Sequence, residues 1–289
     1  MSSRAETKRR IRGVSKTETA PASKAAKSAA KAIAKAITGK TAYFTLKWIA
    51  IICMIVDHTA YIFLNQSIVT DVDKFYTYTA LRTIGRIAFP IFAFELVEAF
   101  YYTKSRKKKF FKILLLAVFS EALFDTVIYS TIELTHQNTC FTLLIGYIGL
   151  IFLDKIYRWQ TKEGDGKTRR AIISIPLYTV TVMIACLLGR ITYVDYGVGG
   201  IALIFAFWFF RKGDWRHILI VTTAFTAIMM RDSFGTIGGL MYIGIFLSGV
   251  IIGLYKQDKL PAFRTNKLVK VLGAWFYPIH LIILGFIKY

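Results

Sequence analysis

The chain has 289 residues, of which 55% are hydrophobic and 15% aromatic, and it contains only 5 prolines. Its mean hydropathy is +0.49. Such a composition is typical of a polytopic membrane protein and excludes an ordinary soluble domain. The formal net charge of +21 does not indicate nucleic-acid binding, because the basic residues lie in the tail and in alternate loops. Cys53, Cys140 and Cys186 stand singly in apolar segments, so neither a metal site nor a disulfide framework is predicted.

Residues 1–42 are polar, basic and rich in Ala, Ser and Lys. Their first half is predicted to be disordered. Lys24, Lys27, Lys31 and Lys35 then recur at helical spacing, which suits either a helix lying on anionic lipid or a solvated Ala/Lys helix. We therefore predict a basic, largely disordered cytoplasmic tail followed by one membrane domain, residues 43–289.

Nine apolar segments follow the tail, and we expect each to form an α-helix that crosses the membrane. The sixth and seventh segments are short, so they fit a re-entrant hairpin as well as two spans. The predicted fold is an all-α, polytopic bundle of about nine transmembrane helices. The segments are 46–65, 84–102, 110–130, 139–154, 171–189, 194–210, 216–230, 234–255 and 270–287.

The basic residues predict the orientation of the bundle. All but six of the 38 Lys and Arg residues lie in residues 1–47 or in the segments 103–112, 155–170, 211–216 and 256–270. Because Lys and Arg concentrate on the cytoplasmic side, the N-terminus is predicted to be cytoplasmic and the C-terminus to face out. The six remaining residues are Lys74, Arg82, Arg86, Arg190, Arg231 and Lys288.

Ionisable residues recur in the middle of the predicted spans. Asp57 and His58 stand at the centre of the first, where each costs roughly 2.5–3.5 kcal/mol to insert. At a rise of about 1.5 Å per residue, Glu95, Glu121 and His280 reach a similar depth in other spans. We expect them to converge near the midplane. Such a layer of charges predicts a reaction centre or a transport path.

Two histidines are candidate proton acceptors. Lys47 and His58 are separated by about three helical turns and so share nearly one face. A neutral imidazole can take a proton from a hydroxyl or an amine, and Asp57 or Glu95 would orient it. Pro278 precedes His280 by two residues and is expected to break the last helix. The alternative is a buried histidine that bonds a backbone carbonyl.

The second span opens with a pair of arginines. Arg82 and Arg86 lie four residues apart, and either bind an anionic acceptor group or pair with an acidic residue of another span. Pro90 follows and is expected to loosen the helix. Below it, Glu95 shares a face with Glu98.

The third span and two outer loops add polar candidates for acceptor binding. Glu121 and Asp125 are four residues apart and would repel unless one is protonated or both meet cations. Asn138 belongs to a polar rim before the fourth span, and Asp195 to the glycine-rich segment 194–200.

The basic loop 104–112, KSRKKKFFK, admits two compatible interpretations. It is a signal for membrane orientation that contacts lipid headgroups, or a site for the phosphates of a nucleotide-like cofactor.

Several segments resemble the TraX family of bacterial membrane proteins, which is linked to N-terminal acetylation of conjugative pilin. They are LKWIAIICMIVDHTAYIF, LRTIGRIAFPIFAFELVEAF, SEALFDT, QNTCFTLLIG and FYPIHL, and they run in order from residue 46 to the C-terminus. The resemblance implies a location in the bacterial cytoplasmic membrane and a role in modifying a peptide amine.

The chain is also similar to the broader group of transmembrane acyltransferases, which mostly modify carbohydrates. In that group a basic residue, ten intervening residues and a catalytic histidine occupy the first span, as Lys47 and His58 do here. A cytoplasmic Arg-x-x-Arg motif binds acyl-CoA, and Arg106 and Lys109 have its spacing. Lysine at the second position offers a point charge and not a bidentate fork.

These observations together predict a membrane acetyltransferase, with the lipid bilayer, acetyl-CoA and a peptide or carbohydrate acceptor as its partners. The predicted catalytic residues are His58, Asp57, His280 and Glu95, with His58 acting as general base or as a transient acetyl carrier. Lys47, Arg106 and Lys109 would bind acetyl-CoA, and the acceptor would contact Arg82, Arg86, Glu121, Asp125, Asn138 and Asp195. The alternatives are a proton-coupled secondary transporter and a non-catalytic subunit that assembles a pilus or surface polymer.

Overall fold

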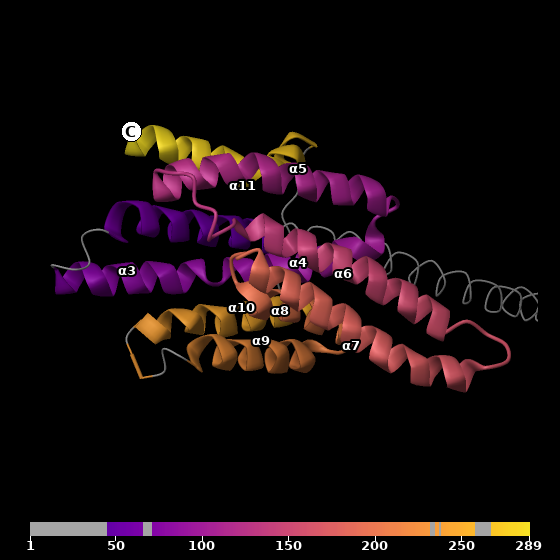
Figure 1. The fold of residues 1–289 in the computed structure, drawn as a ribbon. Helices are drawn as coiled ribbons and strands as arrows, with labels where there is room; N and C mark the ends of the chain where they lie inside the picture. Colours follow the sequence, from indigo (N-terminus) through magenta and orange to yellow (C-terminus); the bar gives the residue numbers. More distant parts are fainter. Residues whose placement is uncertain (1–44, 66–70, 232–234, 237, 258–266) are drawn as a thin grey trace, which may run out of the picture.

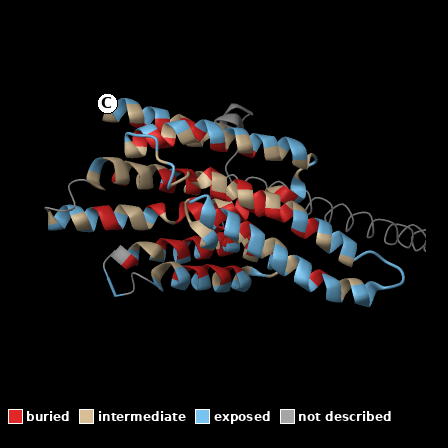
Figure 2. Cartoon of the chain, in the orientation of Figure 1, coloured by how far each residue is buried: buried red, intermediate tan, exposed pale blue. Residues whose placement is uncertain are grey.

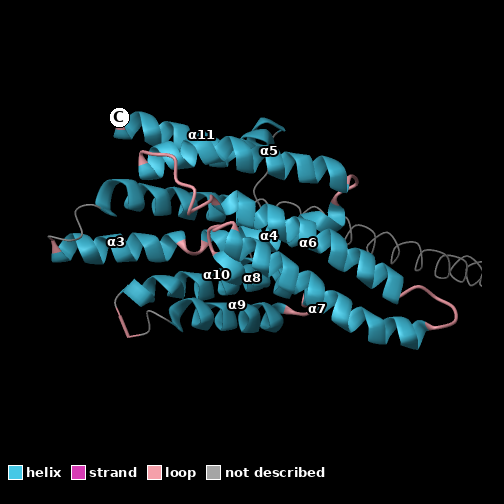
Figure 3. Ribbon diagram, in the orientation of Figure 1, coloured by secondary structure: helices cyan, strands magenta, loops and turns pink. Residues whose placement is uncertain are grey.

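The computed structural model describes residues 45–65, 71–231, 235–236, 238–257 and 267–289, so the predicted tail lies outside the described residues. Every regular element in these ranges is a helix, and one isolated bridge joins Gln137 to Val194. The all-α class is therefore confirmed (Figure 3). The elements are Thr45–Leu64, α3 (Val72–Gly85), α4 (Ala88–Tyr102), α5 (Arg106–Phe124), η2 (Asp125–Tyr129), α6 (Thr139–Gln160), α7 (Lys167–Ile191), α8 (Gly197–Phe209), α9 (Trp215–Met230), η4 (Gly238–Tyr242), α10 (Ile243–Lys256) and α11 (Lys267–Lys288).

Four helices in the described ranges are long and apolar enough to cross a membrane. They are Thr45–Leu64, Thr139–Gln160, Lys167–Ile191 and Gly239–Lys256. Three shorter apolar helices accompany them: Gly197–Phe209, Trp215–Met230 and Trp275–Lys288. The other predicted spans coincide with α4 and α5, which are respectively shorter and more basic. This set of helices is that of a membrane protein.

Helix α3 occupies a stretch between two predicted spans that was not expected to be helical. Its N-cap is Asp71, whose carboxylate accepts hydrogen bonds from the backbone amides of Asp73 and Lys74 at 3.0 and 3.2 Å. Such a cap supplies partners for donors that the first helical turn leaves free. Hydropathy alone misses α3 because the helix is aromatic and polar, without a continuous apolar run.

The predicted second span, 84–102, is interrupted. Helix α3 ends at Gly85 and α4 begins at Ala88. Pro90 falls in the first turn of α4, where a missing backbone N–H removes no helical hydrogen bond. The predicted span is therefore loosened just before Pro90, at the junction with α3, and not within α4.

The break expected at Pro278 is also absent, because α11 continues through this residue to Lys288. Its last residues contact the end of α5, which runs on as the π-helix η2. Lys288 Nζ donates to the carbonyl oxygen of Val127 and to Ser130 Oγ, both at 2.8 Å. Pro278 is thus held inside a helix that is anchored at its C-terminal end.

The helices lie in a bundle with their long axes running across the view of Figure 1. Helix α6 packs against α4, α5, α7 and α8, while α9 pairs with α10 and α11 lies on α5. Burial is concentrated in the middle of the bundle, where Phe89, Phe100, Tyr147 and Phe207 are almost fully enclosed (Figure 2). Helix α7 is largely exposed and apolar, with only 11% of its most hydrophobic window buried, which suits contact with lipid.

Candidate functional site

His58 and His280 form the centre of the site. The first helix carries His58 and α11 carries His280, and His58 Nδ1 lies 2.7 Å from His280 Nε2. The two rings are nearly parallel, with centroids 4.9 Å apart and 14° between their planes. Phe276 stacks on His280 at 5.7 Å and 4°. The fold therefore joins two candidate catalytic residues that are 222 positions apart in the chain.

Asp57 faces α3. Its carboxylate accepts a hydrogen bond from Arg82 in an ion pair, with 14% and 11% of the two side chains exposed. Consecutive helical residues project about 100° apart, so Asp57 and His58 point in different directions. No hydrogen bond joins them among the described residues. Gly85 makes room for the pair, because a Cβ at that position would overlap the Asp57 carboxylate.

Arg86 is held by an aromatic side chain at the start of α8. Its Nη1 donates to the hydroxyl of Tyr196 at 3.1 Å, and its guanidinium lies 5.3 Å from the centre of the Tyr196 ring. Tyr196 in turn stacks on Phe89, with ring centroids 4.0 Å apart. Both arginines of the predicted acceptor site therefore have partners within the protein.

Two cavities meet at His58. The lysine chamber, of about 220 Å³, includes Lys47, Glu95, Lys109 and Lys112 in its lining, together with many apolar side chains. The arginine chamber, of about 200 Å³, includes Tyr61, Arg82, Arg86, Phe124, Ile128, Tyr129 and His136. Asp57, His58 and Asp195 line both chambers.

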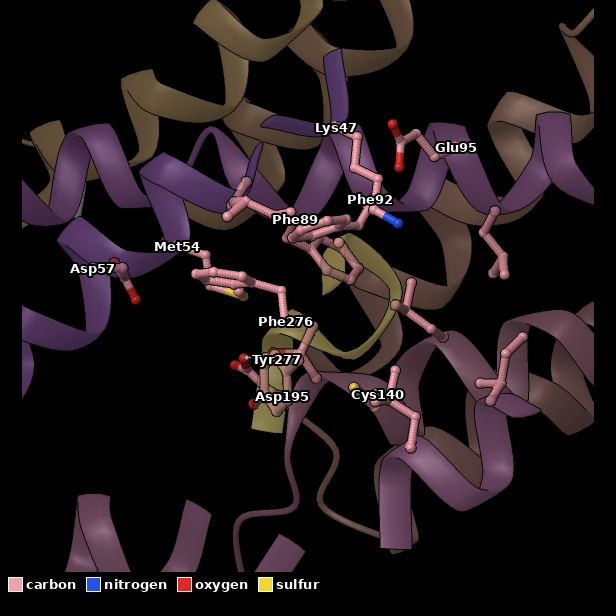
Figure 4. A pocket seen from close by; sticks show the side chains of 18 of the residues that line it. Lys47, Met54, Asp57, Phe89, Phe92, Glu95, Cys140, Asp195, Phe276 and Tyr277 are labelled. Carbon is pink, nitrogen blue, oxygen red and sulfur yellow. Dashed lines mark hydrogen bonds between the residues drawn. The ribbon is translucent and has the colours of Figure 1, made fainter. Parts of the chain in front are cut away.

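Three lysines of the first helix and α5 line the lysine chamber: Lys47, Lys109 and Lys112. Among the described residues, none of them lies within 4 Å of a carboxylate oxygen. Glu95 interacts electrostatically with Lys47 and Lys109. Figure 4 shows Lys47 and Glu95 at one end of this chamber, away from Asp57 and Asp195. Glu95 thus lies with Lys47 at that end of the chamber.

Arg106 lies away from both chambers. Its Nη1 donates to Asp154 Oδ2 at 2.7 Å, and its guanidinium lies 4.3 Å from the centre of the Phe100 ring. Lys112, which the sequence analysis did not single out, lines the lysine chamber in its place. It has the same spacing from Lys109 as Lys109 has from Arg106, one helical turn further along α5.

Glu121 and Asn138 join α5 to α6. The Glu121 carboxylate accepts hydrogen bonds from the backbone amide of Asn138, at 3.0 Å, and from its side-chain amide. Asn138 also caps α6 by accepting from the amide of Cys140 at 2.8 Å. Neither residue lines a chamber. Asp125 is buried at the start of η2 and is likewise absent from both linings.

Asp195 lies in the wall that the two chambers share. Its carboxylate accepts from Thr139 Oγ1 at 2.6 Å and from the amide of Tyr196 at 2.9 Å. His136 Nε2 is 3.9 Å from its Oδ1. The bridge between Gln137 and Val194 holds this loop against the start of α6. Asp195 is therefore a fixed carboxylate in the lining that both chambers share with His58.

The chain also matches a known protein family. The TraX protein family matches residues 43–288. The chain belongs to the TraX family. It is 25% identical over 256 residues to a "Probable fimbrial assembly protein FimC, serogroup H1" of Dichelobacter nodosus, an alignment that covers 83% of this chain and 93% of the relative. No solved structure matches the chain.

In this TraX-family chain, sequence reasoning missed the aromatic residues of the site. Tyr61, Tyr129 and His136 line the arginine chamber, and Tyr277 lines the lysine chamber and packs edge-on against His58 and His280. No motif marks these residues, because aromatic side chains are common throughout the spans. His136 alone carried a signal, since it precedes the polar run Gln137, Asn138 and Thr139.

Proposed function

We propose that the protein is a membrane-embedded acetyltransferase that moves acetyl from cytoplasmic acetyl-CoA to an amine or hydroxyl acceptor. The observation that carries this proposal is the position of His58 in the wall between two chambers of different chemistry. A group-transfer enzyme needs a proton acceptor within reach of both substrates. A residue that only stabilised the bundle would not need to line two cavities.

The lysine chamber suits the acyl donor. Lys47, Lys109 and Lys112 present cations without a carboxylate in ion-pair range in the described part of the chain, and buried charges favour a partner of opposite sign. The phosphates of acetyl-CoA would supply it, with the thioester arm lying along the apolar wall towards His58. In this proposal Lys112 belongs to the donor site and Arg106 does not.

The arginine chamber suits the acceptor. Asp195 offers a carboxylate to an ammonium group or a hydroxyl, and Tyr61 and Tyr129 offer aromatic faces to either. The TraX family and the relative named as a fimbrial assembly protein favour a pilin amine. A carbohydrate hydroxyl is the alternative acceptor.

In the proposed reaction, His58 takes the proton of the acceptor amine or hydroxyl as that atom attacks the thioester carbonyl. The bond from the carbonyl carbon to sulfur breaks, and CoA leaves as a thiolate. The proton then passes from His58 to the sulfur, so that the products are the acetylated acceptor and CoA.

The purified protein should transfer radiolabelled acetyl from acetyl-CoA to a peptide bearing a free amino terminus or to an oligosaccharide. Hydroxylamine treatment of the product separates the two acceptors, because it cleaves an ester and leaves an amide intact. Absence of transfer to both, in protein that retains its folded thermal transition, would refute the proposal.

A non-catalytic role in pilus assembly is the second candidate, favoured by the name of the relative. It is separated from the first by complementation. If a chain with His58→Ala restores pilus assembly in cells that lack the protein, while transferring no acetyl, the assembly role stands without the chemistry.

The donor scheme also requires about nine spans, with the N-terminus in the bacterial cytoplasm and the C-terminus outside. Single cysteines at residues 74 and 135, in a background lacking Cys53, Cys140 and Cys186, should react with an impermeant thiol reagent in intact cells. A cysteine at residue 107 should react only after permeabilisation. All three positions are exposed. The reverse labelling would place the lysine chamber on the side without acetyl-CoA.

A further inference from the structure

A backbone carbonyl determines which nitrogen of His58 is free. His280 Nδ1 lies 3.1 Å from the carbonyl oxygen of Phe276, one turn earlier on α11. A carbonyl oxygen only accepts, so this nitrogen of His280 must carry the hydrogen. In a neutral imidazole the other nitrogen, Nε2, is then an acceptor.

The same reasoning passes to His58. His280 Nε2 can only accept, so the 2.7 Å contact requires the hydrogen on His58 Nδ1. The lone pair of His58 is thereby left on Nε2. Within the described residues no hydrogen bond is formed to this atom. The atom is also not fully enclosed, because it is absent from the buried polar atoms that lack a partner. Since His58 lines both chambers, Nε2 is the atom available to a substrate.

We infer that His280 is a positioning residue that holds His58 in the Nδ1–H tautomer, with Nε2 directed to the reacting groups. This inference rests on the proposed acetyl transfer. His280 does not touch the substrate in this scheme. It accepts the Nδ1–H bond of His58, and the Phe276 carbonyl fixes the tautomer of His280 in turn.

The arrangement also stabilises the charged state that the reaction passes through. When His58 Nε2 takes the acceptor proton, the ring becomes an imidazolium and its Nδ1–H donates more strongly to His280. When the proton leaves for the thiolate of CoA, His58 returns to the same tautomer. Phe276, stacked on His280, restrains the ring of His280 throughout.

Three substitutions of His280 separate this role from others. In His280→Gln the amide oxygen occupies the place of Nε2 and still accepts from His58. In His280→Asn the amide lies at the level of Nδ1 and does not reach, and His280→Leu fills the space without an acceptor. We expect kcat to stay within about tenfold of wild type for Gln and to fall roughly 10²- to 10⁴-fold for Asn and Leu. The KM for acetyl-CoA should not change, because the lysine chamber is untouched.

Other orders of activity overturn the inference. Activity of the Leu variant equal to or above that of the Gln variant would make His280 a packing residue. Loss of activity in all three variants alike would mean that His280 itself exchanges protons. A wild-type protein without any transfer refutes the proposed function and leaves the tautomer to be decided by spectroscopy.

Nitrogen NMR of protein labelled with ¹⁵N-histidine provides that second measurement, and the chain has only 4 histidines. The wild-type spectrum should show His58 protonated at Nδ1, opposite to the tautomer that histidine prefers in water. His280→Leu should shift His58 towards the Nε2–H form, and His280→Gln should not. A His58 resonance of the Nε2–H form in the wild type overturns the inference whether or not transfer is observed.

Discussion

The two chambers differ in how their cations are held. In the arginine chamber, Arg82 is paired with Asp57 and Arg86 is bonded to Tyr196. In the lysine chamber, Lys109 and Lys112 have no carboxylate in ion-pair range among the described residues. A cation that is bonded to the protein's own side chains contributes to the wall, whereas one without a carboxylate in ion-pair range is available to an anionic ligand. The proposed donor site therefore rests on the lysines, whereas both arginines are held by the protein's own side chains.

Removing the residue that both chambers share should have the largest effect. His58→Ala should lower kcat for acetyl transfer by roughly 10²- to 10⁴-fold, because the proton acceptor is lost. The thermal unfolding midpoint should stay near that of the wild type. His217→Ala is the matched control, since His217 is on α9, lines neither chamber and lies 3.0 Å from Asp214 Oδ1 through its Nδ1. Full turnover by the His58 variant would place the proton acceptor elsewhere.

The lysine chamber is tested by neutralising two pairs of lysines on α5, one pair that lines the chamber and one pair that does not. Lys109→Gln with Lys112→Gln should raise the KM for acetyl-CoA by about tenfold or more and leave the KM for the acceptor unchanged. Coulombic binding of phosphates also predicts that the wild-type KM rises with salt.

Lys107→Gln with Lys108→Gln is the matched control for this pair. Both residues are exposed and absent from the chamber lining, so their replacement removes two charges from the same helix without touching the site. Any disturbance of membrane insertion should appear in both double variants. An equal rise of the KM for acetyl-CoA in both double variants would leave the basic segment 104–112 as an orientation signal only.

The ion pair of Asp57 with Arg82 is tested through Gly85, which lines the lysine chamber and contacts Asp57. Gly85→Ala places a methyl group against the Asp57 carboxylate and should displace it from Arg82. We expect kcat to fall several-fold, because the displaced Asp57 lines both chambers together with His58. Gly253→Ala is the control, because the nearest atom to its new Cβ is 3.8 Å away. Wild-type activity in Gly85→Ala would show that the ion pair does not shape the site.

The sequence predicted the layer of the site better than its contacts. Charges in the middle of apolar spans are costly, so Asp57, His58 and His280 were identifiable, and helical rise placed them at one depth. Side-chain partners depend on the rotation of each helix about its axis, which hydropathy does not report. This is why Asp57 was expected to orient His58 but pairs with Arg82.

The same limit explains Arg106 and Lys112. The sequence shows the spacing of the basic residues along α5, but it does not show which of them face the cavity. Asp154 on α6, which is 48 residues further along the chain, forms an ion pair with Arg106. Similarly, Pro278 suggested a broken helix because the helical neighbours that hold α11 together are not readable from local sequence.

The smallest effect should come from a polar residue that lies outside both chambers. Glu121→Leu removes Oε2, the oxygen that accepts both hydrogen bonds from Asn138. The free energy of unfolding should fall by about 1–3 kcal/mol, because the amide of Asn138 loses a partner in the junction between α5 and α6. The KM values for both substrates should remain those of the wild type. A raised acceptor KM at unchanged stability would instead return Glu121 to the acceptor site and extend the arginine chamber to α5.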